Sequence, residues 1–167
     1  MAALDKIKQV AVIGAGDCCD NEYQAAEKVG GLLADHHLIL FCGGLGGVME
    51  AAAKGAQARG GLTVGIIPGI SGENIWCNVV IRTGLGHARN IILVQSADAV
   101  IAIGGSYGTL SEIAAALKMG KPVFGIHTWE VPGVVECNTP DDAVFRVMND
   151  DAPSLSCHTP RDAEESR

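Results

Sequence analysis

The sequence has no long uninterrupted apolar run, although 48% of its 167 residues are hydrophobic. A helix that crosses a membrane needs about 20 consecutive apolar residues, so a membrane-spanning protein is excluded. The chain also lacks, near its start, the basic and then apolar segments that predict secretion. We therefore expect a cytoplasmic protein without a membrane partner.

Positive charge is scarce as well. The chain has 12 Lys and Arg residues against 19 Asp and Glu residues, and its net charge is −7. Proteins that bind nucleic acid neutralise many phosphates with Lys and Arg, so this composition disfavours a nucleic-acid partner. If the protein binds a phosphate, the backbone and a few basic side chains must hold it locally.

Patterns typical of metal sites and of disulfides are missing. The five histidines show no H-E-x-x-H spacing, and the six cysteines include no C-x-x-C pair. In a reducing compartment, a chain of this length gains little from disulfides. We predict no metal site, and we predict free thiols at all six cysteines: Cys18, Cys19, Cys42, Cys77, Cys137 and Cys157.

What the sequence does contain is an alternation of short apolar runs with helical patterns. Strands that are apolar throughout suit a parallel sheet covered on both faces. The sequence therefore predicts an α/β fold, a Rossmann-like doubly wound parallel sheet with helices on both faces. The predicted strands are residues 10–13, 38–41, 63–67, 99–103 and 122–126, with shorter extended pieces at 79–81 and 134–135. The predicted helices are residues 21–35, 47–59, 88–95, 109–119 and 141–148.

The length fits one domain, which we place at residues 1–149. Chains of this size bury roughly 70% of the surface that the unfolded chain exposes, so one proper core is expected. Residues 150–167 are polar, contain proline and have no apolar periodicity. We expect this segment to be a disordered tail.

Three glycine-rich segments each follow a predicted strand directly: Gly14–Asp17, Gly43–Gly47 and Gly104–Gly108. Turns that follow parallel strands emerge at one edge of the sheet, where ligands bind. Glycine permits close approach of the backbone, and a helix start favours an anion. Tight turns alone explain one such segment, but two paired-glycine segments favour a phosphate site. Its predicted residues are Gly14, Gly16, Gly43, Gly44, Gly46, Gly47, Gly104, Gly105, Ser106, Tyr107, Gly108 and Thr109.

Better-known nucleotide motifs do not fit these segments. A dinucleotide fingerprint needs a glycine where Cys19 stands, and it needs an acidic residue after the strand that ends at Cys42. A Walker A loop needs Gly-Lys followed by Ser or Thr, which none of the three segments supplies. The sequence therefore disfavours NAD binding and P-loop ATP hydrolysis.

Arg89 and Glu112 are the candidate catalytic residues. Arg89 stands near the start of a predicted helix and can reach a phosphate, although a solvated surface arginine is the alternative. Glu112 follows the third glycine segment, so its carboxylate can face the ligand crevice. The run from Thr109 to Glu112 also matches a capping box, in which Thr109 caps the helix and Glu112 returns a hydrogen bond. From spacing alone, the cap is the preferred interpretation.

Several of these runs together resemble the Lonely Guy superfamily. They are GGLGGVME at residues 43–50, TGLGHARN at 83–90, AVIAIGGSYGTLSE at 99–112 and KPV at 121–123. The resemblance covers roughly residues 7–148. It implies the fold predicted above and a homodimer or higher homo-oligomer.

Within that superfamily, the cytokinin-activating enzymes cleave the N-glycosidic bond of a nucleoside 5′-monophosphate to base and ribose 5-phosphate. Their pattern P-G-G-x-G-T-x-x-E is similar to residues 103–112, which have Ile103 in place of the proline and one residue more before Gly108. Their arginine–lysine pair is matched only at Arg89, because Asn90 replaces the lysine. By this resemblance, Glu112 activates water, Arg89 positions the substrate and the glycine segments hold the phosphate.

The chain looks closer to a short branch that includes the molybdenum cofactor carrier proteins. These share the segment T-G-L-G-x-A-R and bind a phosphate-bearing pterin without transforming it. Two functions are thus expected as alternatives, a phosphoribohydrolase and a carrier. Neither requires a resident cofactor, and the expected ligand is a nucleoside monophosphate or molybdopterin.

Overall fold

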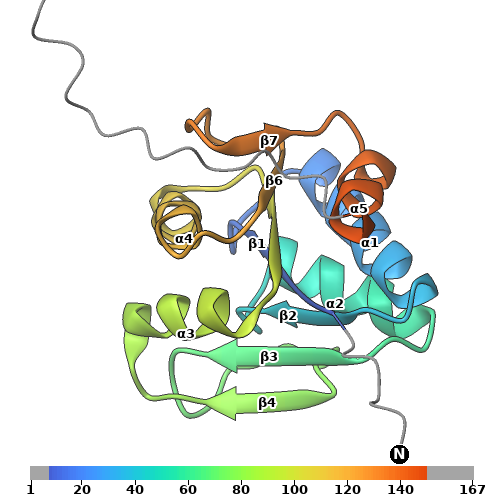
Figure 1. Ribbon diagram of the computed structural model, residues 1–167. Coiled ribbons are helices and arrows are strands. Elements are labelled where there is room, and N and C mark those ends of the chain that lie inside the picture. The colour runs from blue at the N-terminus through green and yellow to red at the C-terminus, as the bar shows by residue number, and fades with distance from the viewer. Residues whose placement is uncertain (1–7, 150–167) are drawn as a thin grey trace, which may run out of the picture.

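The computed structural model describes residues 8–149, which form one seven-stranded parallel sheet in the order β4-β3-β2-β1-β5-β6-β7 (Figure 1). The strands are β1 (Gln9–Gly14), β2 (Ile39–Cys42), β3 (Thr63–Ile67), β4 (Val79–Arg82), β5 (Ala99–Ile103), β6 (Val123–Ile126) and β7 (Val134–Glu136). The helices are α1 (Asp20–Asp35), α2 (Val48–Ala58), α3 (Arg89–Ser96), α4 (Tyr107–Lys118) and α5 (Pro140–Met148), with a 3-10 turn η1 at Gly86–Ala88.

The Rossmann-like fold predicted from the sequence is confirmed. The two short extended pieces are the outer strands β4 and β7, which pair with β3 and β6. The tail predicted from residue 150 lies outside the described residues. No helix among residues 8–149 is long and apolar enough to span a membrane.

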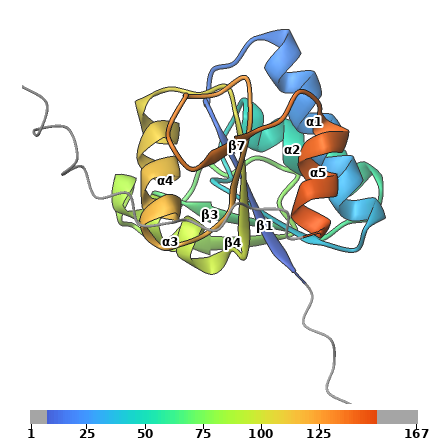
Figure 2. The same cartoon turned by 45° about the horizontal axis from the view of Figure 1, so that its top comes forward.

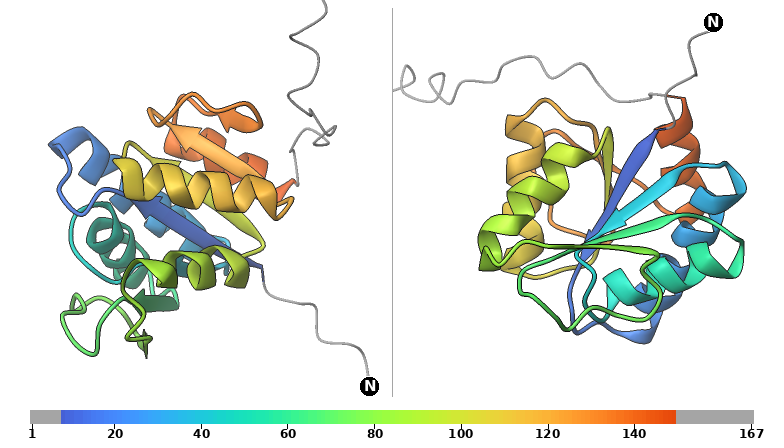
Figure 3. Two further views of the ribbon diagram at one scale, coloured as in Figure 1. Left: turned by 90° about the vertical axis from the view of Figure 1, so that its left-hand side faces the viewer. Right: turned by 90° about the horizontal axis from the view of Figure 1, so that it is seen from below.

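Helices cover both faces of the sheet (Figure 3). On one face, α1, α2 and α5 pack over residues such as Val10 and Ile101. On the other face, α3 and α4 pack over the alternate residues of the same strands, such as Ala11 and Val100. Both sets of strand residues are fully buried, which explains why the central strands are apolar throughout.

Helices α1 and α2 approach each other closely because glycine stands at their contacts. A Cβ on Gly30 would lie 1.9 Å from the Ala52 carbonyl oxygen, and a Cβ on Gly55 would lie 1.9 Å from that of Glu27. The alanine run Ala51–Ala53 is fully buried in this packing. Its small side chains therefore belong to the core between α1 and α2.

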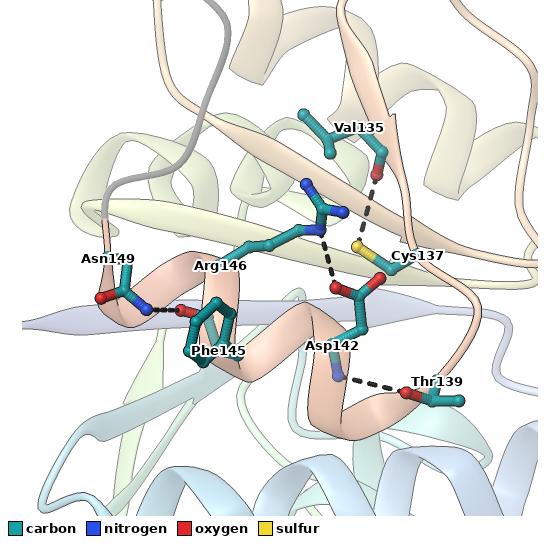
Figure 4. Close-up of polar contacts among 7 residues, drawn as sticks. All are labelled: Val135, Cys137, Thr139, Asp142, Phe145, Arg146 and Asn149. Carbon is teal, nitrogen blue, oxygen red and sulfur yellow. Dashed lines mark hydrogen bonds and ion pairs between the residues drawn. The ribbon is translucent and has the colours of Figure 1, made fainter.

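The last helix is fixed by local hydrogen bonds (Figure 4). Thr139 caps α5, because its hydroxyl accepts a hydrogen bond from the Asp142 N–H at 3.1 Å. The Arg146 Nε donates to Asp142 one turn earlier at 2.8 Å. These contacts fix the start and first turns of α5, and the helix packs beside α1.

Candidate functional site

The three glycine segments meet at the carboxyl ends of β1, β2 and β5, which are neighbours in the sheet. A Cβ on Gly14 would lie 2.6 Å from the Ile103 carbonyl oxygen. The Val48 N–H donates to the Ala15 carbonyl at 3.1 Å, and a Cβ on Gly47 would lie 2.3 Å from the same oxygen. The structure therefore brings all three segments together. Gly16 is exposed on the same edge.

The second segment makes room for an arginine. Gly43 and Gly44 are buried, and Gly44 and Gly47 have positive φ angles of 70° and 62°. A Cβ on Gly43 would lie 2.2 Å from Nη1 and 2.6 Å from Nη2 of Arg89. Gly43 lacks a side chain, and the Arg89 guanidinium occupies the space that one would fill.

Arg89 is the first residue of α3, after the turn η1, and its side chain is only 6% exposed. Its Nη1 is the one buried side-chain nitrogen or oxygen among residues 8–149 without a hydrogen-bond partner. Burial lowers the pKa of Arg89, while the nearby Glu112 and Cys42 act in the opposite direction. Because arginine stays protonated in proteins, the group is a buried cation with an unused donor. The alternative interpretation from the sequence, that Arg89 is a solvated surface residue, is therefore wrong.

Glu112 is not the helix-capping residue that the spacing favoured. Helix α4 begins at Tyr107 after Ser106, so Thr109 already lies within the helix and cannot cap it. Glu112 falls in the second turn, where it is 7% exposed and accepts no hydrogen bond from any residue between 8 and 149. Burial raises the pKa of Glu112 to about 7, and the charge of Arg89 partly opposes that rise. A capping interaction of this kind occurs at α1, where the Cys19 N–H donates to Glu22 at 3.0 Å.

The third segment packs against two side chains that lie apart in sequence. Gly104 and Gly105 have positive φ angles of 51° and 108°. A Cβ on Gly104 would collide with the Glu22 carboxylate, and one on Gly105 would lie 2.5 Å from Thr109. Thr109 is thus buried beneath the segment. The next three residues, Ser106, Tyr107 and Gly108, are exposed.

The loop between β6 and β7, drawn in orange near α4 in Figure 2, adds residues to the site that were not predicted from the sequence. The Thr128 hydroxyl donates to the Gly104 carbonyl at 2.6 Å, and the Trp129 indole Nε1 donates to the Ser106 carbonyl at 3.2 Å. The rings of Trp129 and Tyr107 lie 5.7 Å apart. No motif marks these residues, but β6 ends at the same sheet edge, which is the only signal that points to them.

The loop between β3 and β4 closes the other side of the site. Asn74 fixes it to the second glycine segment: its backbone N–H donates to Gly44 and its side-chain amide donates to Leu45, both at 2.8 Å. Trp76 in this loop packs against the hydrophobic core. This loop therefore supports the glycine segment from outside.

The described cysteines, histidines and acidic residues form no metal cluster. Within residues 8–149, no three His, Cys, Asp or Glu side chains are grouped so that they could hold a metal ion. The five cysteines in this range are free thiols, as predicted, and Cys157 lies outside it. The edge instead places the unpartnered, buried guanidinium of Arg89 near the starts of α2 and α4. This arrangement suits an anion.

A family model described as the SLOG cluster4 family matches residues 7–159. An uncharacterized protein of Archaeoglobus fulgidus is 49% identical over 144 residues, which are 83% of this chain and 93% of that protein. A probable cytokinin riboside 5′-monophosphate phosphoribohydrolase of Oryza sativa subsp. japonica is 32% identical over 62% of this chain. The match spans only 46% of the rice enzyme.

Two solved structures resemble the whole sheet with its helices. The molybdenum cofactor binding protein from Rippkaea orientalis has a TM-score of 0.84 and 32% identity, and the match covers 89% of this chain and 100% of that one. The Moco carrier protein from Chlamydomonas reinhardtii has a TM-score of 0.81 and 32% identity, with 86% and 97% covered.

Proposed function

Because the chain belongs to the SLOG cluster4 family, we propose that it binds a small phosphorylated heterocycle across the carboxyl edge of its sheet. The ligand is a nucleoside 5′-monophosphate or a phosphate-bearing pterin. The observation that carries the proposal is the buried guanidinium of Arg89, whose Nη1 has no partner within residues 8–149. A phosphate oxygen supplies the missing acceptor.

The energetics favour an anion at this position. A buried donor without an acceptor costs about 1–3 kcal/mol, and more when the group is charged. A charge-assisted hydrogen bond to phosphate removes that cost and forms one of the stronger contacts available to arginine. Glu112, the acidic neighbour whose charge favours the protonated guanidinium, has a pKa of about 7. Near neutral pH, Arg89 therefore lacks a full counter-charge.

Helix starts add to this attraction. Helix α2 begins at Val48, directly after Gly47, and α4 begins at Tyr107, three residues after Gly104. The first N–H groups of a helix have no partner within it and carry partial positive charge. Each start follows a glycine segment against which Arg89 or Thr109 packs, so both helix dipoles favour an anion at this edge.

The first candidate function is hydrolysis of the N-glycosidic bond of a nucleoside monophosphate. The support for it is Glu112, whose raised pKa of about 7 suits a group that gains and loses a proton near neutral pH. In that reaction, ionised Glu112 accepts a proton from water as the water oxygen bonds to the ribose anomeric carbon. The bond to the base breaks, and the base leaves with the proton that Glu112 took from water. Arg89 holds the substrate.

The second candidate is a carrier that binds the ligand without cleaving it. It is favoured by how much of each relative this chain matches. The two molybdenum cofactor proteins match over nearly their whole lengths, whereas the rice enzyme matches over less than half of its length. The replacements Ile103 and Asn90 also separate this chain from the enzyme pattern. In the carrier, Glu112 balances the charge of Arg89 and takes no part in chemistry.

The proposal is tested by calorimetric titration of the protein with AMP, with adenosine as the control that lacks a phosphate. We expect AMP to bind and adenosine to bind at least tenfold more weakly. Equal affinities for both would contradict a phosphate site. Chromatography of the same mixtures for free adenine separates the candidates. Adenine that disappears in Glu112→Gln, with AMP binding retained, supports the hydrolase, and binding without turnover supports the carrier.

A further inference from the structure

Two cavities lie beside the third glycine segment, on the side away from Arg89. One, of about 500 Å³, is lined by Gly104, Gly105 and Glu22 together with the loop at residues 127–130. The other, of about 560 Å³, lies behind the same loop and extends to Gly125 and Glu136. Four residues, 127 to 130, line both cavities. The first cavity therefore opens directly from the backbone that we propose holds the phosphate.

The walls of these cavities offer a flat aromatic surface. Trp129 lines both cavities, is 36% exposed, and is fixed by the hydrogen bond from its Nε1 to Ser106. Tyr107 stands next to it, 80% exposed, with a ring-centroid distance of 5.7 Å. An aromatic side chain held in one orientation gives a planar heterocycle a stacking partner at little entropic cost. A base stacked in this way contributes about 1–3 kcal/mol in nucleotide-binding proteins.

The charges of the walls are of one sign. The described residues that line the two cavities include the carboxylates of Glu22, Glu130 and Glu136 but no lysine or arginine. Glu22 is already engaged with the Cys19 N–H, whereas Glu130 is exposed and makes no hydrogen bond or ion pair with residues 8–149. A phosphate is repelled here, and a ring edge that carries N–H donors is attracted. A carboxylate accepts two parallel N–H bonds well.

We propose that these cavities hold the ring of the ligand, and that they select a heterocycle with an amino group beside a ring N–H, the edge that guanine and pterins share. Trp129 stacks on the ring, and the Glu130 carboxylate accepts from the amino group and the ring N–H. This inference rests on the proposed phosphate site, because the phosphate at Arg89 fixes which end of the ligand enters the cavities. It makes adenine nucleotides the weaker ligands.

His127 marks the place where the ring enters. Its φ of 47° is one of two positive values outside glycine among residues 8–149, a conformation that costs of order 1 kcal/mol. Its side chain lines both cavities and a third recess beside Cys19 and Asn21. The turn at His127 directs the loop back over the third glycine segment, which sets Trp129 against Ser106.

The test uses three probes: GMP, IMP, which lacks the amino group of GMP, and ribose 5-phosphate, which lacks the ring. Tryptophan emission reports the ring site, because the chain has two tryptophans and Trp76→Phe leaves Trp129 as the sole reporter. We expect GMP to quench Trp129 and to bind about tenfold more tightly than IMP. Trp129→Leu lowers the affinity for GMP about tenfold and leaves that for ribose 5-phosphate unchanged.

The carboxylate is tested separately by Glu130→Gln. We expect this variant to lose the preference for GMP over IMP. Glu27→Gln, which removes a carboxylate paired with Lys54 on the α1–α2 side, keeps that preference. If GMP and IMP bind equally to the wild type and Trp129 emission does not change, the ring site is wrong and the phosphate site stands. If none of the three probes binds, both are wrong.

Discussion

The two sides of the carboxyl edge differ in almost every property that decides what they bind. On the α3 side, the Arg89 guanidinium is 6% exposed and occupies the space beside Gly43. On the β6 side, the loop from His127 is exposed, carries the Trp129 ring and borders cavities with acidic walls. One end of the edge thus carries a buried positive charge, and the other end is an open cavity with aromatic and acidic walls. We infer from this difference that a ligand with a phosphate at one end and an uncharged ring at the other binds in one orientation.

The largest effect that sharpens this contrast is expected on stability, from Glu112→Gln. The folded-state pKa of Glu112 is about 7, above its ordinary value of 4.5, so the folded state favours the protonated acid. The stability that this protonation contributes is fully present below pH 4.5 and is lost as the pH rises through 7. Glutamine stays neutral, so the variant should be more stable than the wild type at pH 8 by about 3 kcal/mol, and similar to it at pH 4.5.

This prediction is checked by urea unfolding at the two pH values. The matched control is Glu136→Gln, an exposed carboxylate at the end of β7, which should change stability little at either pH. Equal stability of Glu112→Gln and the wild type at pH 8 would mean that the buried carboxylate is not destabilised there. The inference that Arg89 lacks a full counter-charge near neutral pH would then be wrong.

The next effect is expected on affinity, from Arg89→Met. Methionine fills a similar volume without charge, so the variant should lower the affinity for ribose 5-phosphate at least thirtyfold, which corresponds to about 2 kcal/mol. Arg82→Met is the control, since Arg82 is exposed and pairs with Glu73. Calorimetric titration compares the two variants. A normal affinity in Arg89→Met would place the phosphate elsewhere.

The smallest effect is expected from Gly108→Ala. This variant tests whether Gly108 serves only the fold or also contacts the phosphate. Gly108 is the second residue of α4, and a Cβ there meets nothing within 4 Å. Alanine should therefore raise the free energy of unfolding, by up to roughly 1 kcal/mol, because it suits a helix better. If the phosphate lies against this helix start, the same variant lowers phosphate affinity several-fold.

Gly31→Ala in the middle of α1 is the matched control for that variant. Its added Cβ makes only ordinary contacts, the nearest at 3.4 Å, so it should change stability in the same sense. It lies away from the glycine segments and should leave phosphate affinity unchanged. A loss of affinity in both variants would indicate a general effect on folding and would count against a contact at Gly108.

The architecture was predictable from the sequence because its signals are local. The central strands are short apolar runs, three of which (β1, β2 and β5) lead directly into glycine, and such runs predict buried parallel strands wherever they fall. The convergence of the three segments followed from the parallel topology alone. The outer strands were harder to predict, because β4 is partly exposed and β7 has only three residues, so their patterns are weak.

The site was less predictable because its character depends on contacts between distant residues. The burial of Arg89 comes from its contact with Gly43, 46 positions earlier, which no local pattern reveals. The capping-box spacing at Thr109 and Glu112 misled the prediction because residues three apart also share a face inside a helix. Helix α4 simply begins two residues earlier than predicted. Trp129 and Thr128 carry no motif and depend on where β6 ends.

A crystal structure of the protein with GMP tests most directly whether the ligand binds in this orientation. We predict a phosphate oxygen at about 2.7–2.9 Å from the Arg89 Nη1, with the phosphate on the glycine segments and the guanine ring against Trp129. A phosphate bound away from Arg89, with its Nη1 still unpartnered, would contradict it.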